Sequence, residues 1–170
     1  MTSEFKGDPS ETTLKEAQEW LLQGVRKGVI CPCCTQHAKV YSRTITNTMA
    51  YALILIERFF RRANEWLHVP SYLNDLGLDP KLAASIRGDW TKLRHWGLIE
   101  EKPEVRDDGS NRAGFYKITQ RGVDFVHDRI QVRKFIYLYG SRVLDRPCDE
   151  TISIGDALGE KFHYRELMDR

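Results

Sequence analysis

Three cysteines and a histidine lie close together near the N-terminus, at Cys31, Cys33, Cys34 and His37. Cys31 and Cys34 have the C-x-x-C spacing with which a tight turn can place two thiolates on one zinc ion, about 2.3 Å from each sulfur. A tetrahedral site needs two further ligands, and the sequence has no second close pair of cysteines or histidines. We therefore predict Cys31, Cys34 and His37 as metal ligands. The remaining ligand would come from Cys33, Cys148, His163 or another subunit.

The same cysteine turn has two other interpretations, as ordinary thiols or as a redox pair. A redox pair lacks the thioredoxin-like βαβ setting here, and three cysteines within four residues cannot form a spaced disulfide framework. This clustering indicates a reduced compartment or a metal. Pro32 and the alternating residues 39–45 resemble one half of a zinc ribbon. We expect any metal to be a structural zinc that fastens the N-terminal segment to the domain after it, and we expect no other cofactor.

A second candidate site is a basic face on the helix predicted over residues 80–96. Asp79 caps this helix, Pro80 opens it and Gly97 ends it. Leu82, Ile86 and Leu93 fall on its buried side, and small and basic residues fall on the other side or its flanks. Such a face admits close approach to a major groove and gives cations for bases and phosphates. The predicted contacts are Lys81, Ala84, Arg87, Thr91 and Lys92, with Arg106 and Arg112 from the loop over residues 103–113.

Hydrophobic periodicity indicates the elements that must position these residues. A capping box, Thr13 with Glu16, begins a first helix. A wide apolar stripe from Met49 to Leu67 predicts a central core helix. We then expect a short helix over 70–77, the helix over 80–96, strands over 98–102 and 114–118, and a helix that Thr119 caps and that ends near residue 130. A β-hairpin over 132–144 follows, and then short helices within 152–168, with Ser153 near the start of the first.

The order of these elements over residues 47–130 resembles the winged helix-turn-helix domain, and in particular the MarR-like regulators. Residues 93–100, Leu-Arg-His-Trp-Gly-Leu-Ile-Glu, match the passage from recognition helix to wing in that family. Residues 116–122, Tyr-Lys-Ile-Thr-Gln-Arg-Gly, match its return from the wing. We expect an α+β protein with three parts: residues 1–46 with the first helix and cysteine turn, the winged helix domain over 47–130, and the hairpin and extension over 131–170.

The resemblance implies a transcription regulator or accessory factor that binds duplex DNA. The net charge of +2 is too small to argue for nucleic acid alone, although residues 39–66 and 81–121 each carry +3. Asp107 and Asp108 in the wing loop would repel phosphate. The alternative is a winged helix that binds or inhibits a larger protein machine without touching nucleic acid.

Other features of the chain define the remaining expectations. We find no Gly-rich phosphate loop, paired-carboxylate setting or nucleophile elbow, so an enzyme is not expected. No apolar run reaches the roughly 20 residues of a membrane span, and no signal pattern opens the chain, which predicts a cytoplasmic protein without a membrane partner. The first helix and the 132–144 hairpin need surfaces to pack on, which favours a homodimer.

Overall fold

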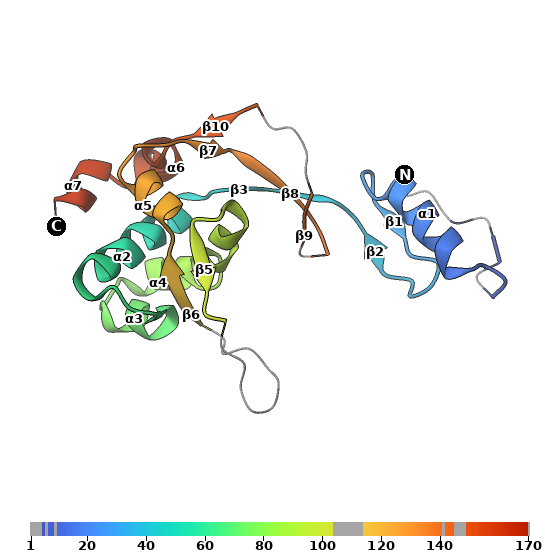
Figure 1. Cartoon of the computed structure of the whole chain (residues 1–170), viewed down its shortest axis with the longest axis horizontal. Helices are drawn as coiled ribbons and strands as arrows, with labels where there is room; N and C mark the ends of the chain where they lie inside the picture. Colours follow the sequence, from blue (N-terminus) through green and yellow to red (C-terminus); the bar gives the residue numbers. More distant parts are fainter. Residues whose placement is uncertain are drawn as a thin grey trace. The chain divides into compact units, whose positions relative to one another are not determined.

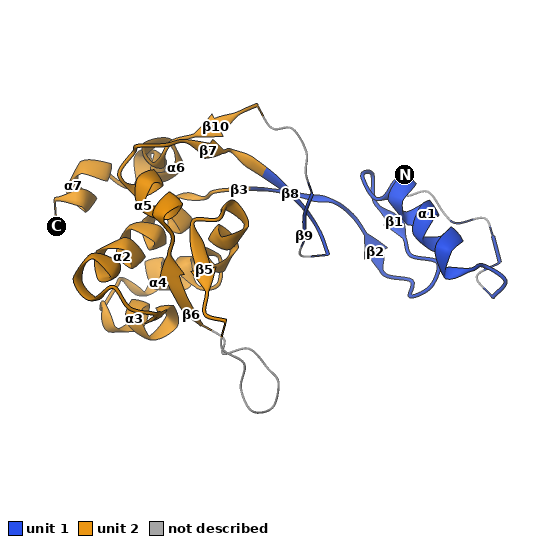
Figure 2. Cartoon of the chain, viewed as in Figure 1, with its two compact units in different colours: residues 1–43, 136–147 blue, residues 44–135, 148–170 orange. Residues whose placement is uncertain are grey.

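The computed structural model describes residues 5, 7–8, 10–103, 114–140, 142–144 and 149–169. The fold is α+β, with short helices and small antiparallel sheets. The chain divides into two compact units, one of residues 1–43 and 136–147 and the other of residues 44–135 and 148–170 (Figure 2). The larger unit contains the segment expected to form the winged helix, and residues 131–170 are shared between the two units.

The smaller unit begins with helix α1 (Leu14–Gly24), and the predicted capping box is confirmed. Thr13 accepts from the backbone N–H of Glu16, whose carboxylate accepts from the backbone N–H of Thr13. Strands β1 (Val29–Ile30) and β2 (His37–Ala38) pair as a hairpin that presents the cysteine turn. A three-stranded sheet follows, in the order β3 (Tyr41–Thr44), β8 (Phe135–Tyr139), β9 (Arg142–Leu144). The β8–β9 pairing confirms the predicted second hairpin in its later part, whereas residues 132–133, expected in the same hairpin, pair with residues 151–152 instead.

The core of the larger unit is helix α2 (Asn47–Ala63), as the apolar stripe predicted (Figure 1). Thr46 caps its start by accepting from the backbone N–H of Met49. Leu53, Ile54 and Ile56 are completely or almost completely buried. The expected continuation to Leu67 is wrong, because Asn64 adopts a left-handed conformation that ends the helix. Leu67 instead begins strand β4 (Leu67–His68).

Two short helices follow strand β4. Helix α3 (Val69–Asp75) has Pro70 in its first turn, and helix α4 (Pro80–Ile86) is capped by Asp79, whose carboxylate accepts from the backbone N–H groups of Lys81 and Leu82. The single helix predicted over 80–96 is wrong. It breaks at Arg87, whose ψ is 119°, and at Gly88, whose φ of +81° is favourable only for glycine. After this break the chain forms the 3-10 helix η1 (Trp90–Trp96), which ends at Gly97.

Strands β4, β5 (Ile99–Glu101) and β6 (Phe115–Ile118) form an antiparallel sheet in the order β4-β6-β5. Ile99 pairs with Ile118, and Leu67 pairs with Tyr116. Helix α5 (Gln120–Val126) follows, capped by Thr119 as predicted. The strands predicted on either side of the 103–113 loop are therefore confirmed, whereas β4 was not foreseen.

The C-terminal segment packs on the same unit. Strands β7 (Val132–Arg133) and β10 (Thr151–Ile152) pair antiparallel and lead to helix α6 (Ile154–Leu158), the 3-10 helix η2 (Gly159–Lys161) and helix α7 (Tyr164–Met168). Phe162 stacks on Tyr51 of α2, and the hydroxyl of Tyr164 donates to the carbonyl of Val126. The predicted short helices are confirmed. Among the described helices, none has the length and apolar character of a membrane span.

The segment that follows η1 and the start of α5 pack closely, with their backbones in direct contact. Thr119 donates its backbone N–H to the carbonyl of Leu98 and its hydroxyl to the carbonyl of Gly97. A Cβ placed on Gly122 would lie 2.1 Å from the carbonyl oxygen of Leu98 and 2.6 Å from Ile118 Cγ1. Because the nearest of these atoms is backbone, it cannot move aside without displacing strand β5.

We therefore expect Gly122→Ala to destabilise the protein by about 2–3 kcal/mol through overpacking. The matched control is Gly155→Ala in helix α6, where an added Cβ has only Ser153 Oγ within 4 Å, at 3.9 Å. This control should be neutral or stabilising by up to about 0.5 kcal/mol, because alanine favours the helix. Urea denaturation of the two variants measures the difference, and equal stabilities would contradict the close packing.

Candidate functional site

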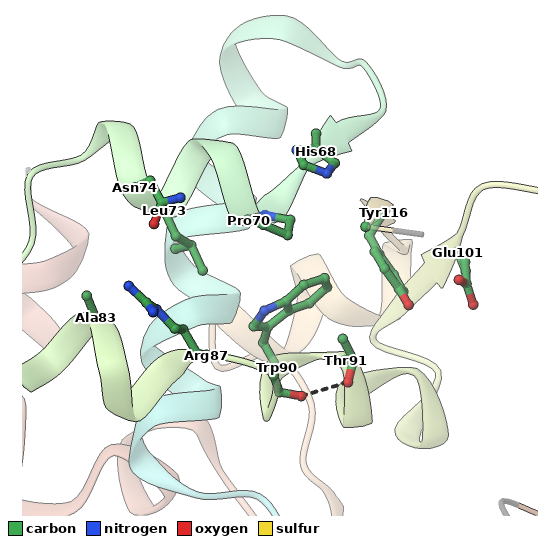
Figure 3. A pocket seen from close by; sticks show the side chains of 12 residues that line it. His68, Pro70, Leu73, Asn74, Ala83, Arg87, Trp90, Thr91, Glu101 and Tyr116 are labelled. Carbon is green, nitrogen blue, oxygen red and sulfur yellow. Dashed lines mark hydrogen bonds between the residues drawn. The ribbon is translucent and has the colours of Figure 1, made fainter. Parts of the chain in front are cut away.

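A cavity of about 650 Å³ opens on the larger unit between α3, the end of α4, the start of η1 and the sheet β4-β6-β5 (Figure 3). Strand β4 contributes His68, α3 contributes Leu73, and β6 contributes Tyr116. The helix break supplies Arg87 and Trp90. The volume falls in the range of small-molecule sites, and the lining combines apolar side chains with a few polar groups, which is typical of such sites.

Trp90 and Tyr116 form an aromatic wall of this cavity. Their rings meet edge to face, with centroids 4.7 Å apart and an interplanar angle of 89°. Both side chains are buried, so the contact ties η1 to strand β6. Burial raises the pKa of Tyr116, and the negative charge of Glu101 adds to that rise. The phenol therefore stays protonated at neutral pH, as a hydrogen-bonding group and not as an anion.

Arg87 lies at the rim of the cavity because the chain leaves the helix at this residue. Its backbone N–H still donates to the carbonyl of Ala83, but its carbonyl no longer continues the helical pattern. Thr91 donates its hydroxyl to the carbonyl of Gly88 at 2.8 Å, which closes the turn (Figure 3). The guanidinium of Arg87 extends toward the end of α3, where Asn74 lies. The break thus places an exposed cation beside an aromatic hollow.

The structure separates the predicted nucleic-acid contacts into two groups. Lys81, Ala84 and Arg87 are exposed on or at the end of α4, whereas Thr91 and Lys92 are half-buried in η1. Of these five, Arg87 and Thr91 line the cavity.

The cations near this face differ in whether they already have an acidic partner. Lys92 is paired with Asp89, and Arg94 is paired with Glu101 at 3.0 Å. In the part of the chain that the structure describes, Lys81 and Arg87 have no ion pair. Arg106, Arg112, Asp107 and Asp108 lie outside the described residues.

Sequence reasoning missed the cavity because core packing is the usual explanation for a tryptophan such as Trp90 at a helix position. Trp90 and Tyr116 are indeed buried, but they form one wall of a hollow. The available signal was Gly88, which follows Arg87 directly and is unfavourable in a helix interior. A break there exposes the surface beneath the missing turn.

The cysteine turn is the tip of the β1–β2 hairpin. Ile30 pairs with His37 across the hairpin, and Cys31 donates its backbone N–H to the carbonyl of Gln36. The backbone N–H groups of Cys34 and Cys33 donate to the Cys31 sulfur and hold the pKa of that thiol below its usual value. Burial and the nearby Cys31 raise the pKa of Cys33. The turn therefore favours the thiolate at Cys31, which is the form that binds metals.

A complete metal site is not assembled by the residues that the structure describes. Within them, no group of three or more histidine, cysteine or acidic side chains is arranged around a common position. Cys31, Cys33 and Cys34 are free thiols there, and Cys148, one of the predicted completing ligands, is outside the described residues. Zinc at Cys31, Cys34 and His37 remains a prediction.

Comparisons with models of known protein families, with curated proteins and with solved structures give no match to this chain. Its function is therefore inferred from the residues and their geometry.

If the cysteine turn holds zinc, protein purified without added metal should contain about one zinc per chain by elemental analysis. Replacing Cys31 and Cys34 together with Ser should remove that zinc, because both predicted thiolate ligands are lost. The control is Cys33→Ser, which leaves the C-x-x-C pair intact. A zinc content near zero in the unmodified protein, with no loss of stability in a chelator, would contradict the metal site.

Proposed function

We propose that residues 47–130 form a winged helix domain that binds duplex DNA, as a transcription regulator or accessory factor. The order of elements supports this: α2, β4, α3, α4, η1, β5, β6 and α5 follow one another along the chain. The antiparallel order β4-β6-β5 is the observation that carries the proposal, because it places the two wing strands beside the strand that precedes the helix pair. The two short helices α3 and α4, joined by a turn containing Gly77, support the helix-turn-helix part of the proposal.

Helix α4 is the element we assign to the DNA groove. Its seven residues extend roughly 10 Å, and a major groove about 12 Å wide admits a helix. Ala84 is small and exposed, which permits close approach, while the exposed Lys81 and Arg87 supply charge at its two ends. Because the helix ends at Ile86, the base contacts are limited to two turns. Thr91 and Lys92 are then better suited to phosphates than to bases.

The protein-interaction alternative is favoured by the cavity beside α4. Pro70, Leu73 and Trp90 give it an apolar lining that can take an apolar side chain from another protein. Glu101 in the same lining is unfavourable for phosphate, although Arg94 neutralises it in part. Binding to random duplex DNA over a range of salt concentrations separates the two functions, because phosphate contacts release counterions and lose affinity steeply as salt rises.

We expect Arg87→Ala and Lys81→Ala each to weaken binding to random duplex DNA and to reduce the slope of log affinity against log salt by about 1. The control is Arg26→Ala, which removes one exposed positive charge from the smaller unit, outside the helix assigned to DNA. It should leave both affinity and slope nearly unchanged. Fluorescence anisotropy with a labelled duplex measures both quantities. No binding even at low salt would favour the protein-interaction function, and unchanged affinity in both variants would show that α4 is not the contacting helix.

We also propose that the chain forms a two-fold dimer, which would match a palindromic DNA site. The support is an apolar surface in the smaller unit, where Leu14 is 80% exposed and Leu22 is 60% exposed on α1. Light scattering at micromolar concentration should give twice the chain mass. Leu22→Lys should shift that mass toward the monomer, and a monomer mass for the unmodified protein would contradict the dimer.

A further inference from the structure

A second cavity, of about 310 Å³, lies on the larger unit between helix α2 and the end of α7, and three arginines line it. They are Arg58, Arg61 and Arg62, with Met168 and Asp169 on the other side. The arginines are spaced i, i+3 and i+4, so they share one face of α2. Basic residues on the outer side of an amphipathic helix are usually only solvated, whereas these three line a cavity.

Arg58 differs from the other two arginines, because among the described residues neither a hydrogen-bond partner for its buried nitrogens nor the helix dipole stabilises its charge. Its Nε and Nη2 nitrogens are buried and have no hydrogen-bond partner among the described residues. A buried donor without a partner destabilises the folded protein, and a charged donor does so more strongly. Attraction to the carboxyl end of the helix accounts for Arg61 and Arg62 in the last turn, but Arg58 lies before that turn.

The acidic groups near the cluster leave a positive charge uncompensated. Arg61 is paired with the buried Glu57, Nε to Oε1 at 2.9 Å, and this carboxylate is shared with His127. Within the described parts of the chain, Arg58 and Arg62 have no ion pair, and Asp169 lines the cavity without forming one. Three guanidinium groups against two carboxylates leave a local excess of one positive charge.

A phosphate group supplies the negative charge and the hydrogen-bond acceptors that Arg58 lacks among the described residues of this cavity. Guanidinium groups present several N–H donors in a planar array that matches the oxygens of phosphate, and such charge-assisted hydrogen bonds are stronger than neutral ones. The volume lies at the lower end of the range for ligand sites, so it suits a compact anion. We propose that Arg58, Arg61 and Arg62 form a phosphate-binding site, filled by a small phosphorylated ligand or by the phosphate of a nucleic-acid strand.

Thermal unfolding of the full chain tests this site, with inorganic phosphate compared with chloride at equal ionic strength. A ligand that binds only the folded state raises the midpoint as its concentration exceeds the dissociation constant. We expect phosphate to raise the midpoint of the unmodified protein. Arg58→Met should raise the midpoint in chloride, because it removes two buried nitrogens that have no hydrogen-bond partner among the described residues, and should abolish the effect of phosphate. Equal phosphate effects in the two proteins, or none in the unmodified protein, would overturn the proposal.

Calorimetric titration with inorganic phosphate supplies a second measurement that does not depend on stability. Arg62→Gln changes an exposed residue and should weaken phosphate binding about tenfold, whereas Asp169→Asn should strengthen it by removing a repelling charge. Arg26→Gln, at an exposed position in the smaller unit, is the control and should change the affinity less than twofold. Unchanged binding in Arg62→Gln would also overturn the site.

Two further probes distinguish the sources of the phosphate. Phenyl phosphate represents a small phosphate monoester, and dimethyl phosphate represents the diester of a nucleic-acid backbone. Arg58-dependent binding of the monoester alone identifies a small ligand, and Arg58-dependent binding of the diester identifies a strand contact. Failure of all three phosphates contradicts this site but leaves the DNA proposal standing, because that proposal rests on α4 and its own salt-dependence experiment.

Discussion

The burial of helix α2 is the constraint on which the larger unit depends. Its residues 52–57 are all almost completely removed from solvent, and α4, η1, β6, α5 and α6 all pack against this helix. Each fully buried aliphatic side chain contributes about 1.5–3 kcal/mol, so the burial of this helix outweighs the weak propensities of the short elements around it. Helices of five to seven residues such as α4 and α6 are unstable alone and exist because α2 supplies an apolar surface.

The same constraint explains why the chain breaks between α4 and η1. Ile86, Trp90 and Leu93 are all buried, and the tryptophan must also reach Tyr116 on strand β6. A turn at Gly88 rotates the chain so that Trp90 packs against the sheet, while Arg87 remains at the surface. The cavity is the space left beside this turn. One glycine thus determines both the length of the helix assigned to DNA and the presence of a hollow next to it.

The two candidate anion-binding surfaces of the larger unit, the α4–η1 face and the arginine cluster of α2, differ in how many of their cations already have an acidic partner. Lys92 and Arg94 in η1 already have acidic partners, so only part of the predicted basic face is available for phosphate. On α2, by contrast, a buried carboxylate pairs with Arg61, and the two neighbouring arginines have no counter-ion among the described residues. The number of basic residues is a poor guide to either surface, since pairing and burial decide which cations attract an anion.

The sequence by itself determined the elements with strong local signals. The capping residues Thr13, Thr119 and Ser153 begin helices where expected, because a side-chain oxygen three residues before a backbone N–H is a local requirement. Helix α2 and the strands on either side of the 103–113 loop were also predictable from local sequence, because the periodicity of apolar residues indicates which face of an element is buried.

Only the tertiary structure decided the strand at Leu67, the cavity beside Arg87 and the buried nitrogens of Arg58, which have no partner among the described residues. Each of these depends on contacts between residues distant in the chain, which no local pattern contains. Leu67, for example, pairs with Tyr116, and the end of α2 at Asn64 is what allows it to do so.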